Sequence, residues 1–340
     1  MDSDGVEWEN PMRPNEKNVA DIHERQRESL HICVNLRPSA VQISNELLEV
    51  AVNRRAALLT AETDAVRLID GAGDGLPGIY LETFAGRLLL STTDGRVPSE
   101  IKHWLMDCGE ASYVKRLDLH QKQSPWHLGG PEASDPFLIR ENGLRFEISF
   151  QCGYSQGIFL DQRDNRAETR RRMRPGLRLL NTFAYTGAFS AAAASAGAET
   201  TTLDLSQPYL DWAKRNLAHN SIDPAAHHFC KGDTFHWLRR FAKQGRRFDA
   251  IVLDPPTFSR DVKGKVFRVE KDFGELAALA SQTLAPGGWL LCCTNFRGMN
   301  TREFERLATS KLPRTMLATH APMPADFTDM PYLKSLWLSL

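Results

Sequence analysis

The sequence predicts an α/β protein, with a small α+β domain followed by a Rossmann-like, mainly parallel and doubly wound sheet in residues 152–340. Apolar strand-like runs alternate with helical segments through the second half, from "LRLLNTF" and "GAFSAAAASAG" to "FDAIVLDPP" and "WLLCCTN". Such alternation is typical of a parallel sheet with helices on both faces. The length of 340 residues is also sufficient for two domains. Because such sheets bind ligands at the carboxyl ends of their strands, we expect the functional residues there.

The first half of the chain has a different order of helix-like and strand-like segments. Residues 1–40 are polar and are expected to form a peripheral arm, whereas 41–151 are expected to form a helix and a small α+β domain. In that domain, "ISNELLEVAVNRRAALL" has helical spacing of apolar residues, and "VRLID", "GIYLETF" and "RLLLSTT" are strand-like. A second helix is expected at "PSEIKHWLMDCG". Asn142-Gly143 then predicts a hairpin between "FLIREN" and "LRFEISF".

Bulk properties exclude some classes of protein. No apolar run approaches the length that crosses a bilayer, and the N-terminal residues lack an apolar signal core, so we expect a cytoplasmic protein without membrane contact. The six cysteines form no C-x-x-C pair, so no metal site is expected. The 42 basic and 42 acidic side chains cancel. Any binding to a polyanion must therefore come from local clusters.

The turn after the first strand of the second domain indicates the class of ligand. It reads "NTFAYTGAFS", with one glycine, and lacks the G-x-G-x-x-G pattern that lets a backbone approach a pyrophosphate. A ligand without phosphate, S-adenosylmethionine, fits such a turn. The residues of the turn expected to hold it are Asn181, Thr182, Phe183, Tyr185, Thr186 and Gly187.

Acidic residues follow the next three strands. Asp204, with Leu205 and Ser206 beside it, is expected to bind the ribose, and Asp233 with Thr234 the adenine. Asp254 lies in "LDPPTFSR", where two prolines directly after it make a stiff turn, and it is expected to orient the methyl acceptor. Each carboxylate alone is also explained as a helix cap or a strand end, but three in matching positions favour a cofactor site.

These motifs carry a resemblance to a known family. The set "GDGLPGIYLETFAGRLLL", "GIFLDQRDNR", "NTFAYTGAFS", "LDLSQPYLDWAKRNLAHN", "KGDTFHWL" and "LDPPTFSR" resembles the bacterial large-subunit (23S) ribosomal RNA methyltransferases of the cytosine-C5 and guanine-N7 types, over about residues 50–340. The resemblance implies a class I methyltransferase domain with S-adenosylmethionine as cofactor and Asn220 among the residues that bind it. It also implies that Arg163 faces the methionine carboxylate or the RNA, above Ile158, Phe159 and Leu160.

Two features separate this chain from the cytosine-C5 type. Members of that type begin with an RNA-binding module of the PUA kind, and residues 1–40 are shorter and more polar than such a module. Methylation at carbon 5 also needs a thiolate that adds to the ring. Aligned with the family, the position of that cysteine falls on Asn295, whereas Cys293 lies two residues earlier. "CCTNFRGMN" resembles the guanine-N7 type, but "YLKSLWLSL" resembles the C5 type, so the subtype stays open between Cys293 catalysis and direct transfer beside Asn295.

Two basic clusters are candidates for binding RNA, and the expected partner is ribosomal RNA or a large-subunit particle. One lies on the helix that begins at Asp161, and the other follows "DPPTF". Two other functions stay open: methylation of a small molecule or a protein, and a ribosome-assembly factor that binds cofactor and RNA without turnover. The oligomeric state is not predicted. The candidate RNA-binding residues are Arg166, Arg170, Arg260, Lys263, Lys265 and Arg268.

Overall fold

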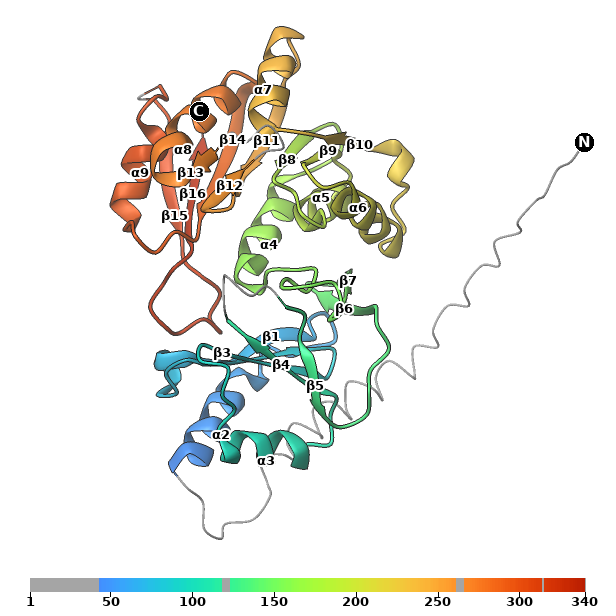
Figure 1. Ribbon diagram of the computed structural model, residues 1–340. Coiled ribbons are helices and arrows are strands. Elements are labelled where there is room, and N and C mark those ends of the chain that lie inside the picture. The colour runs from blue at the N-terminus through green and yellow to red at the C-terminus, as the bar shows by residue number, and fades with distance from the viewer. Residues whose placement is uncertain (1–42, 118–122, 261–265, 314, 340) are drawn as a thin grey trace, which may run out of the picture.

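The computed structural model describes residues 43–117, 123–260, 266–313 and 315–339. The chain forms an N-terminal sheet domain and a larger C-terminal α/β domain, with a short hairpin beside both (Figure 1). The α/β prediction is confirmed. Within the described part of the chain, no helix is both long and apolar enough to cross a bilayer.

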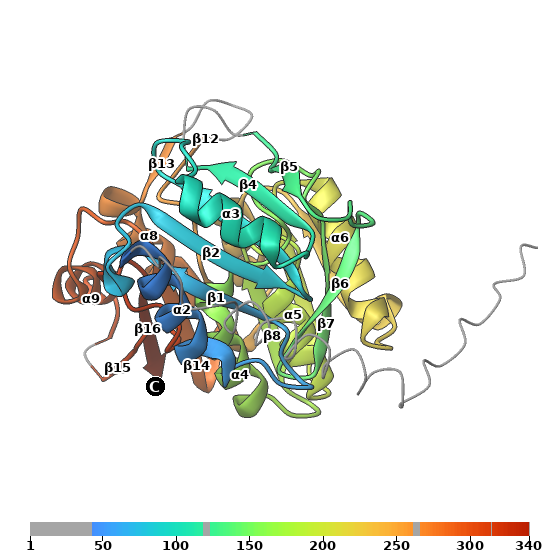
Figure 2. The ribbon, with the colours of Figure 1, turned by 90° about the horizontal axis from the view of Figure 1, so that it is seen from below.

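The N-terminal domain is built on a five-stranded sheet in the order β1-β2-β3-β4-β5. Only β3 and β4 pair in parallel; the other neighbours are antiparallel. Helices α2 (Ile43–Ala56) and α3 (Ser99–Asp107) lie together on one face of the sheet (Figure 2), because Leu48, Ile101 and Trp104 bury their apolar side chains against the strands. The remaining elements are β1 (Ala65–Asp70), η1 (Gly71–Asp74), β2 (Ile79–Phe84), β3 (Arg87–Thr92), β4 (Ser112–Arg116) and β5 (Trp126–Gly129).

The hairpin predicted at Asn142-Gly143 is formed by β6 (Phe137–Glu141) and β7 (Leu144–Ile148). Asn142 has a φ of 51° and Gly143 a φ of 78°, which are the left-handed conformations that such a turn requires. The apolar side of the hairpin belongs to a core shared with Phe84 of the N-terminal sheet and Ala191 of the C-terminal domain. The hairpin therefore joins the two domains by apolar packing.

The C-terminal domain contains a seven-stranded sheet in the order β10-β9-β8-β11-β14-β16-β15. The first five strands are parallel, and β16 pairs antiparallel with both of its neighbours. The order reverses direction at β8, which leaves a crevice beyond the carboxyl ends of β8 and β11. The strands are β8 (Arg178–Thr182), β9 (Glu199–Asp204), β10 (His228–Lys231), β11 (Phe248–Leu253), β14 (Leu284–Thr294), β15 (Leu317–Ala321) and β16 (Lys334–Ser339).

Helices cover both faces of this sheet (Figure 1). On one face, Phe189 of α5 packs against Val252 and Leu291, and on the other, Phe273 of α8 and Phe304 of α9 pack edge to face. A short ribbon of β12 (Phe258–Arg260) and β13 (Val266–Arg268) follows the Asp254-Pro-Pro turn. The other elements are η2 (Leu160–Gln162), α4 (Arg163–Arg172), α5 (Ala188–Ser195), α6 (Gln207–His219), η3 (Pro224–Ala226), α7 (Thr234–Lys243), α8 (Val269–Ser281) and α9 (Thr301–Thr309).

The segment between β15 and β16 fastens the C-terminal domain to the N-terminal sheet. Asp326 is fully buried, and its carboxylate accepts hydrogen bonds from the Arg67 backbone N–H at 2.9 Å and from the Arg163 guanidinium at 3.0 and 2.5 Å. Arg55 donates to the Asp326 carbonyl at 2.9 Å and pairs with Asp74 at 2.8 Å. The buried charges at this junction are paired, which offsets the free energy of removing them from water.

Candidate functional site

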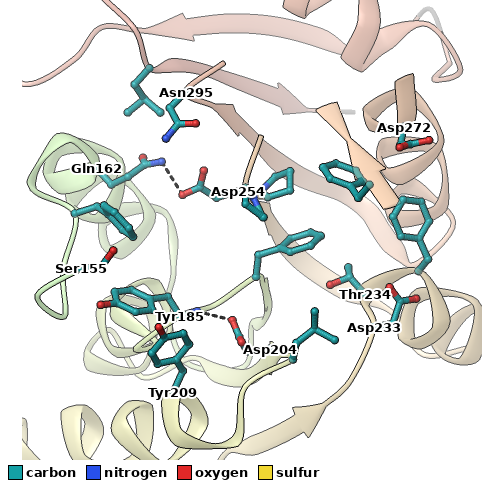
Figure 3. A pocket seen from close by; sticks show the side chains of 18 of the residues that line it. Ser155, Gln162, Tyr185, Asp204, Tyr209, Asp233, Thr234, Asp254, Asp272 and Asn295 are labelled. Carbon is teal, nitrogen blue, oxygen red and sulfur yellow. Dashed lines mark hydrogen bonds between the residues drawn. The ribbon is translucent and has the colours of Figure 1, made fainter. Parts of the chain in front are cut away.

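A cavity of about 500 Å³ lies beyond the carboxyl ends of the parallel strands of the C-terminal sheet, as expected for such a fold (Figure 3). It extends from Asp204 and Asp233, at the ends of β9 and β10, to Asp254 and Asn295, at the ends of β11 and β14. The three acidic residues that the sequence analysis selected thus share one cavity.

The turn after β8 has a backbone conformation that residues other than glycine rarely adopt. Phe183 and Tyr185 line the cavity with φ values of 52° and 50°, in the left-handed region. Gly187 also has a positive φ, of 74°, and a Cβ there would lie 2.5 Å from the Cβ of Ala213. Strained backbone concentrates at functional sites, where the surrounding structure holds it in place. Here the Tyr185 N–H donates to the Asp204 carboxylate at 2.9 Å, which ties the turn to β9.

The Asp204 carboxylate is held firmly between two donors. It accepts hydrogen bonds from the backbone N–H groups of Tyr185 and Ser206, both at 2.9 Å, while burial raises its pKa above the ordinary value. A carboxylate accepts about four hydrogen bonds, so lone pairs remain for two sugar hydroxyls. Asp233 is the N-cap of α7, where it accepts from the His236 N–H at 2.8 Å, and it also lines the cavity.

Asp254 lies at the opposite end of the cavity from Asp204 (Figure 3). Burial and the nearby Asp161 carboxylate raise the pKa of Asp254 to about 7, because both disfavour its charged form. The Gln162 side-chain N–H donates to the Asp254 carboxylate at 2.9 Å and acts in the opposite direction, lowering that pKa. Asp254 is therefore a carboxyl group whose charge changes near neutral pH.

Gln162 is a site residue that sequence reasoning did not select. Its amide is fixed from both sides: Nε2 donates to Asp254, and Oε1 accepts from Asn165 Nδ2 at 2.6 Å. Asn165 donates in turn to the Ser335 hydroxyl of β16 at 2.7 Å. The signal was present in "GIFLDQRDNR", where two polar residues, Asp161 and Gln162, follow an apolar step, but only the fold shows that Gln162 faces Asp254.

Cys293 and Asn295 differ in their access to the cavity. Asn295 lines it, whereas Cys293 is fully buried behind Gln162, with its sulfur 3.9 Å from Gln162 Oε1 and 3.7 Å from the Ser335 hydroxyl. Burial, with the Asp254 carboxylate nearby, raises the pKa of the Cys293 thiol well above its ordinary value. The thiolate is thus disfavoured in this environment.

Eight of the predicted site residues line the cavity, and three others support the turn behind it. Asn181 donates to Ser190, Thr182 to the Val252 carbonyl and Thr186 to the Gly157 carbonyl, so the side chains of all three are engaged within the fold. Asn220 exchanges hydrogen bonds with the Arg145 backbone of the hairpin, away from the cavity. The predicted residues that line the cavity are Phe183, Tyr185, Asp204, Leu205, Asp233, Thr234, Asp254 and Asn295.

Two predictions about the "FLDQRDNR" segment need correction. Arg163 was expected to face the ligand, but its guanidinium is buried against Asp326 at the domain junction and does not line the cavity. Phe159 was expected to pack beneath the polar groups, but its ring is 48% exposed at the cavity, 5.4 Å from that of Tyr185. Ile158 and Leu160 are buried, as predicted. Phe159 is extended and Leu160–Gln162 form a short 3-10 helix before α4, so no single helix face includes these neighbours, and the domain contact decides which of them faces the ligand.

The structure describes the side chains of three candidate RNA-binding residues, and these differ in their surroundings. Arg166 is buried and makes a double hydrogen bond to Glu141, with both distances 2.6 Å, so it is a structural cation and its predicted RNA contact is corrected. Arg170 is exposed, and the Arg268 guanidinium lies 5.6 Å from the centre of the half-exposed Phe258 ring. Lys263 and Lys265 lie outside the described residues, and of Arg260 only the backbone is described.

The charged groups that line the cavity indicate which charge a bound ligand should have. Six carboxyl groups line the cavity, and no lysine or arginine does so among the described residues. A cavity of this kind repels a phosphate and attracts a cation. A sulfonium ligand with an adenine, which packs against aromatic and apolar walls, fits these residues, whereas a nicotinamide dinucleotide does not. The carboxyl groups are those of Asp161, Asp204, Asp233, Asp254, Asp272 and Glu275.

Among the described residues, no cluster of three histidine, cysteine, aspartate or glutamate side chains is arranged to hold a metal ion.

Comparisons with known proteins identify the family of the chain. Residues 108–334 match the family described as S-adenosylmethionine-dependent methyltransferase. The chain is 33% identical over 322 residues to a ribosomal RNA large subunit methyltransferase of Deinococcus radiodurans, covering 86% of this chain and 78% of that protein. It is 32% identical to a putative ribosomal RNA large subunit methyltransferase of Bacillus subtilis, over 82% of this chain and 74% of the relative.

A solved structure of a putative methyltransferase complexed with SAH superimposes with a TM-score of 0.80 at 27% identity, covering 89% of this chain and 83% of the other.

Proposed function

The chain belongs to the S-adenosylmethionine-dependent methyltransferase family, and from this we propose that it methylates a base of large-subunit ribosomal RNA by direct transfer to a ring nitrogen, as in the guanine-N7 reaction. S-adenosylmethionine is its cofactor; when bound, it supplies an electrophilic methyl group on a positively charged sulfur. Both relatives described above carry names as large-subunit ribosomal RNA methyltransferases, which supports the class of substrate.

One observation carries the choice of direct transfer. Cys293 is sealed behind Gln162, whereas Asp254 and Asn295 line the cavity. Methylation at cytosine C5 requires a thiolate that reaches carbon 6, and the buried Cys293 thiol neither reaches the cavity nor ionises readily. Guanine N7 presents a lone pair and needs no nucleophile from the protein.

The charges of the cavity favour the same reaction. Transfer of a methyl group to a neutral ring nitrogen leaves the positive charge on the base. Asp254 and Asp161 line the cavity at the acceptor end, and carboxylates already in position stabilise such a developing cation without reorganising. In C5 methylation the Asp254 carboxylate opposes the Cys293 thiolate by repulsion.

Positioning accounts for the remaining acceleration. The Asp254-Pro-Pro turn is stiff, and Gln162 holds one oxygen of Asp254 at 2.9 Å, which leaves the other oxygen to accept from an N–H of the base. Orienting two reactants in this manner lowers the activation free energy by about 7–11 kcal/mol in favourable cases. The exposed Phe159 ring offers an apolar surface for a base turned out of its stack.

The test is mass spectrometry of nucleosides after incubation with isotopically labelled S-adenosylmethionine. Ribosomal RNA and large-subunit particles from cells that lack the protein are the substrates. We expect labelled 7-methylguanosine. Labelled 5-methylcytidine that disappears in Cys293→Ser would overturn direct transfer and restore the thiolate mechanism.

Asp254→Ala separates an enzyme from an assembly factor that binds without turnover. We expect this variant to lose methyl transfer while it keeps cofactor binding, measured by calorimetry, because Asp204 and Asp233 bind the other end of the ligand. Absence of label in any RNA with the wild-type protein, when cofactor binding is intact, would refute the proposed function.

A further inference from the structure

Helix α7 has an unusual charge pattern. Of the helices that the structure describes, it alone contains arginine and lysine without any aspartate or glutamate. Its buried side is apolar, with Phe235, Leu238 and Phe241 in the core of the domain. Its outer side, which we call the α7 basic face, consists of His236, Arg239, Arg240 and Lys243 and continues after the helix with Arg247.

The cations of this face are exposed and largely uncompensated. Arg239 pairs with Glu275 at 2.8 Å, with both side chains about half exposed, so this pair contributes little to stability. The Arg240 guanidinium lies 4.8 Å from the centre of the Trp237 ring. For Arg240 and Lys243, no carboxylate within the described part of the chain lies at ion-pair distance. Side chains that stabilise the fold this weakly are available for a ligand.

The α7 basic face begins at the rim of the cavity. Asp233, Thr234 and Phe235, at the start of α7, line the cavity, and the Glu275 partner of Arg239 does so as well. From there α7 extends to the outer edge of the domain (Figure 1). A ligand that occupies the cavity with one part can therefore contact the face with another.

The cavity itself cannot attract the phosphates of RNA, because the groups that line it are acidic. The chain as a whole does not attract them either, since its 42 basic and 42 acidic residues cancel. A polyanionic substrate thus needs a local basic surface near the cavity, and arginine beside an aromatic ring, as Arg240 lies beside the partly buried Trp237, is a feature of such surfaces.

We propose that the α7 basic face binds the phosphate backbone of the ribosomal RNA substrate and holds it while one base enters the acidic cavity. This inference rests on the proposed function for the identity of the RNA. Phosphate contacts position a nucleic acid without reading its sequence, so α7 sets affinity, and the groups around Asp254 select the base.

The test compares two pairs of neutralised cations in the full chain. The test variant is Arg240→Gln with Lys243→Gln. The control is Arg302→Gln with Lys311→Gln, which removes the same charge from exposed positions on and just after α9, away from α7 (Figure 1). Binding to fluorescently labelled large-subunit ribosomal RNA is measured by anisotropy from about 50 to 300 mM KCl, together with the kcat and KM of methyl transfer.

We expect the test variant to bind more weakly by roughly eightfold per lost contact at about 0.1 M salt, with a slope of log K against log salt that is shallower by about 2. KM should rise with kcat and cofactor affinity unchanged, and the control should behave as wild type. Equal behaviour of the two variants, or a wild-type protein without affinity for RNA, would overturn the proposal. RNA binding that depends on α7 without methyl transfer would support the surface and refute the proposed function, so the two failures are distinguishable.

Discussion

Replacement of Asp254 by asparagine tests the central electrostatic feature of the site. The carboxyl group lies at the cavity wall beside the Asp161 carboxylate, and partial burial with that neighbouring charge raises its pKa from an ordinary 3.8 to about 7. The asparagine side chain would keep the shape of the aspartate and the acceptor for Gln162 while it removes the charge. We therefore expect the Asp254→Asn variant to lose methyl transfer and to gain stability at alkaline pH.

The magnitude follows from the change in pKa. A rise from 3.8 to about 7 corresponds to about 4 kcal/mol for a fully dry carboxylate. Asp254 opens onto the cavity, where water screens it, so we expect roughly half of this value. Because the pKa is higher in the folded state, the stabilisation is complete below pH 3.8 and is lost as the pH rises through 7.

The assay is urea unfolding of wild type and Asp254→Asn at pH 5, 6, 7 and 8. The two proteins contain the same titrating groups except for Asp254. The difference between their unfolding free energies, followed against pH, therefore reports the ionisation of Asp254. We expect the variant to gain about 1–2 kcal/mol over wild type between pH 5 and pH 8. A difference that does not change with pH would mean that Asp254 ionises normally, and the reasoning on its environment would be wrong.

Three further substitutions test the neighbouring contacts. Gln162→Leu removes a hydrogen bond that lowers the pKa of Asp254, so methyl transfer should fall at pH 7 and recover toward pH 9; an unshifted pH–rate profile would contradict this role. Cys293→Ser should keep kcat within about twofold of wild type, because direct transfer needs no thiolate, and a loss of about 100-fold would argue for one. Arg163→Met leaves Asp326 buried without its cation and should lower the free energy of unfolding by about 3–5 kcal/mol, with cofactor affinity of the folded protein unchanged by calorimetry. A stable Arg163 variant that fails to bind cofactor would restore the role first expected for that residue.

Local sequence patterns were sufficient for the architecture and for one side of the site. Apolar runs of strand length alternating with amphipathic helices determine a parallel sheet, because only that arrangement buries both faces of the strands. Parallel strands all end at the same edge, so Asp204, Asp233 and Asp254 had to meet once each was assigned to a strand end. The turn at Asn142-Gly143 was equally local, since few residues adopt positive φ.

Contacts between distant segments decided the rest. Three polar residues that are close together in the chain contact three different parts of the fold. Gln162 donates to Asp254, Arg163 pairs with Asp326, and Arg166 pairs with Glu141. The sequence determined that this segment is helical and charged. Which of its charges are buried, and whether Cys293 reaches the cavity, depended on how the domain junction and β16 close over the segment. A side chain's partner is set by the surface packed against it, and that surface comes largely from residues distant in the chain.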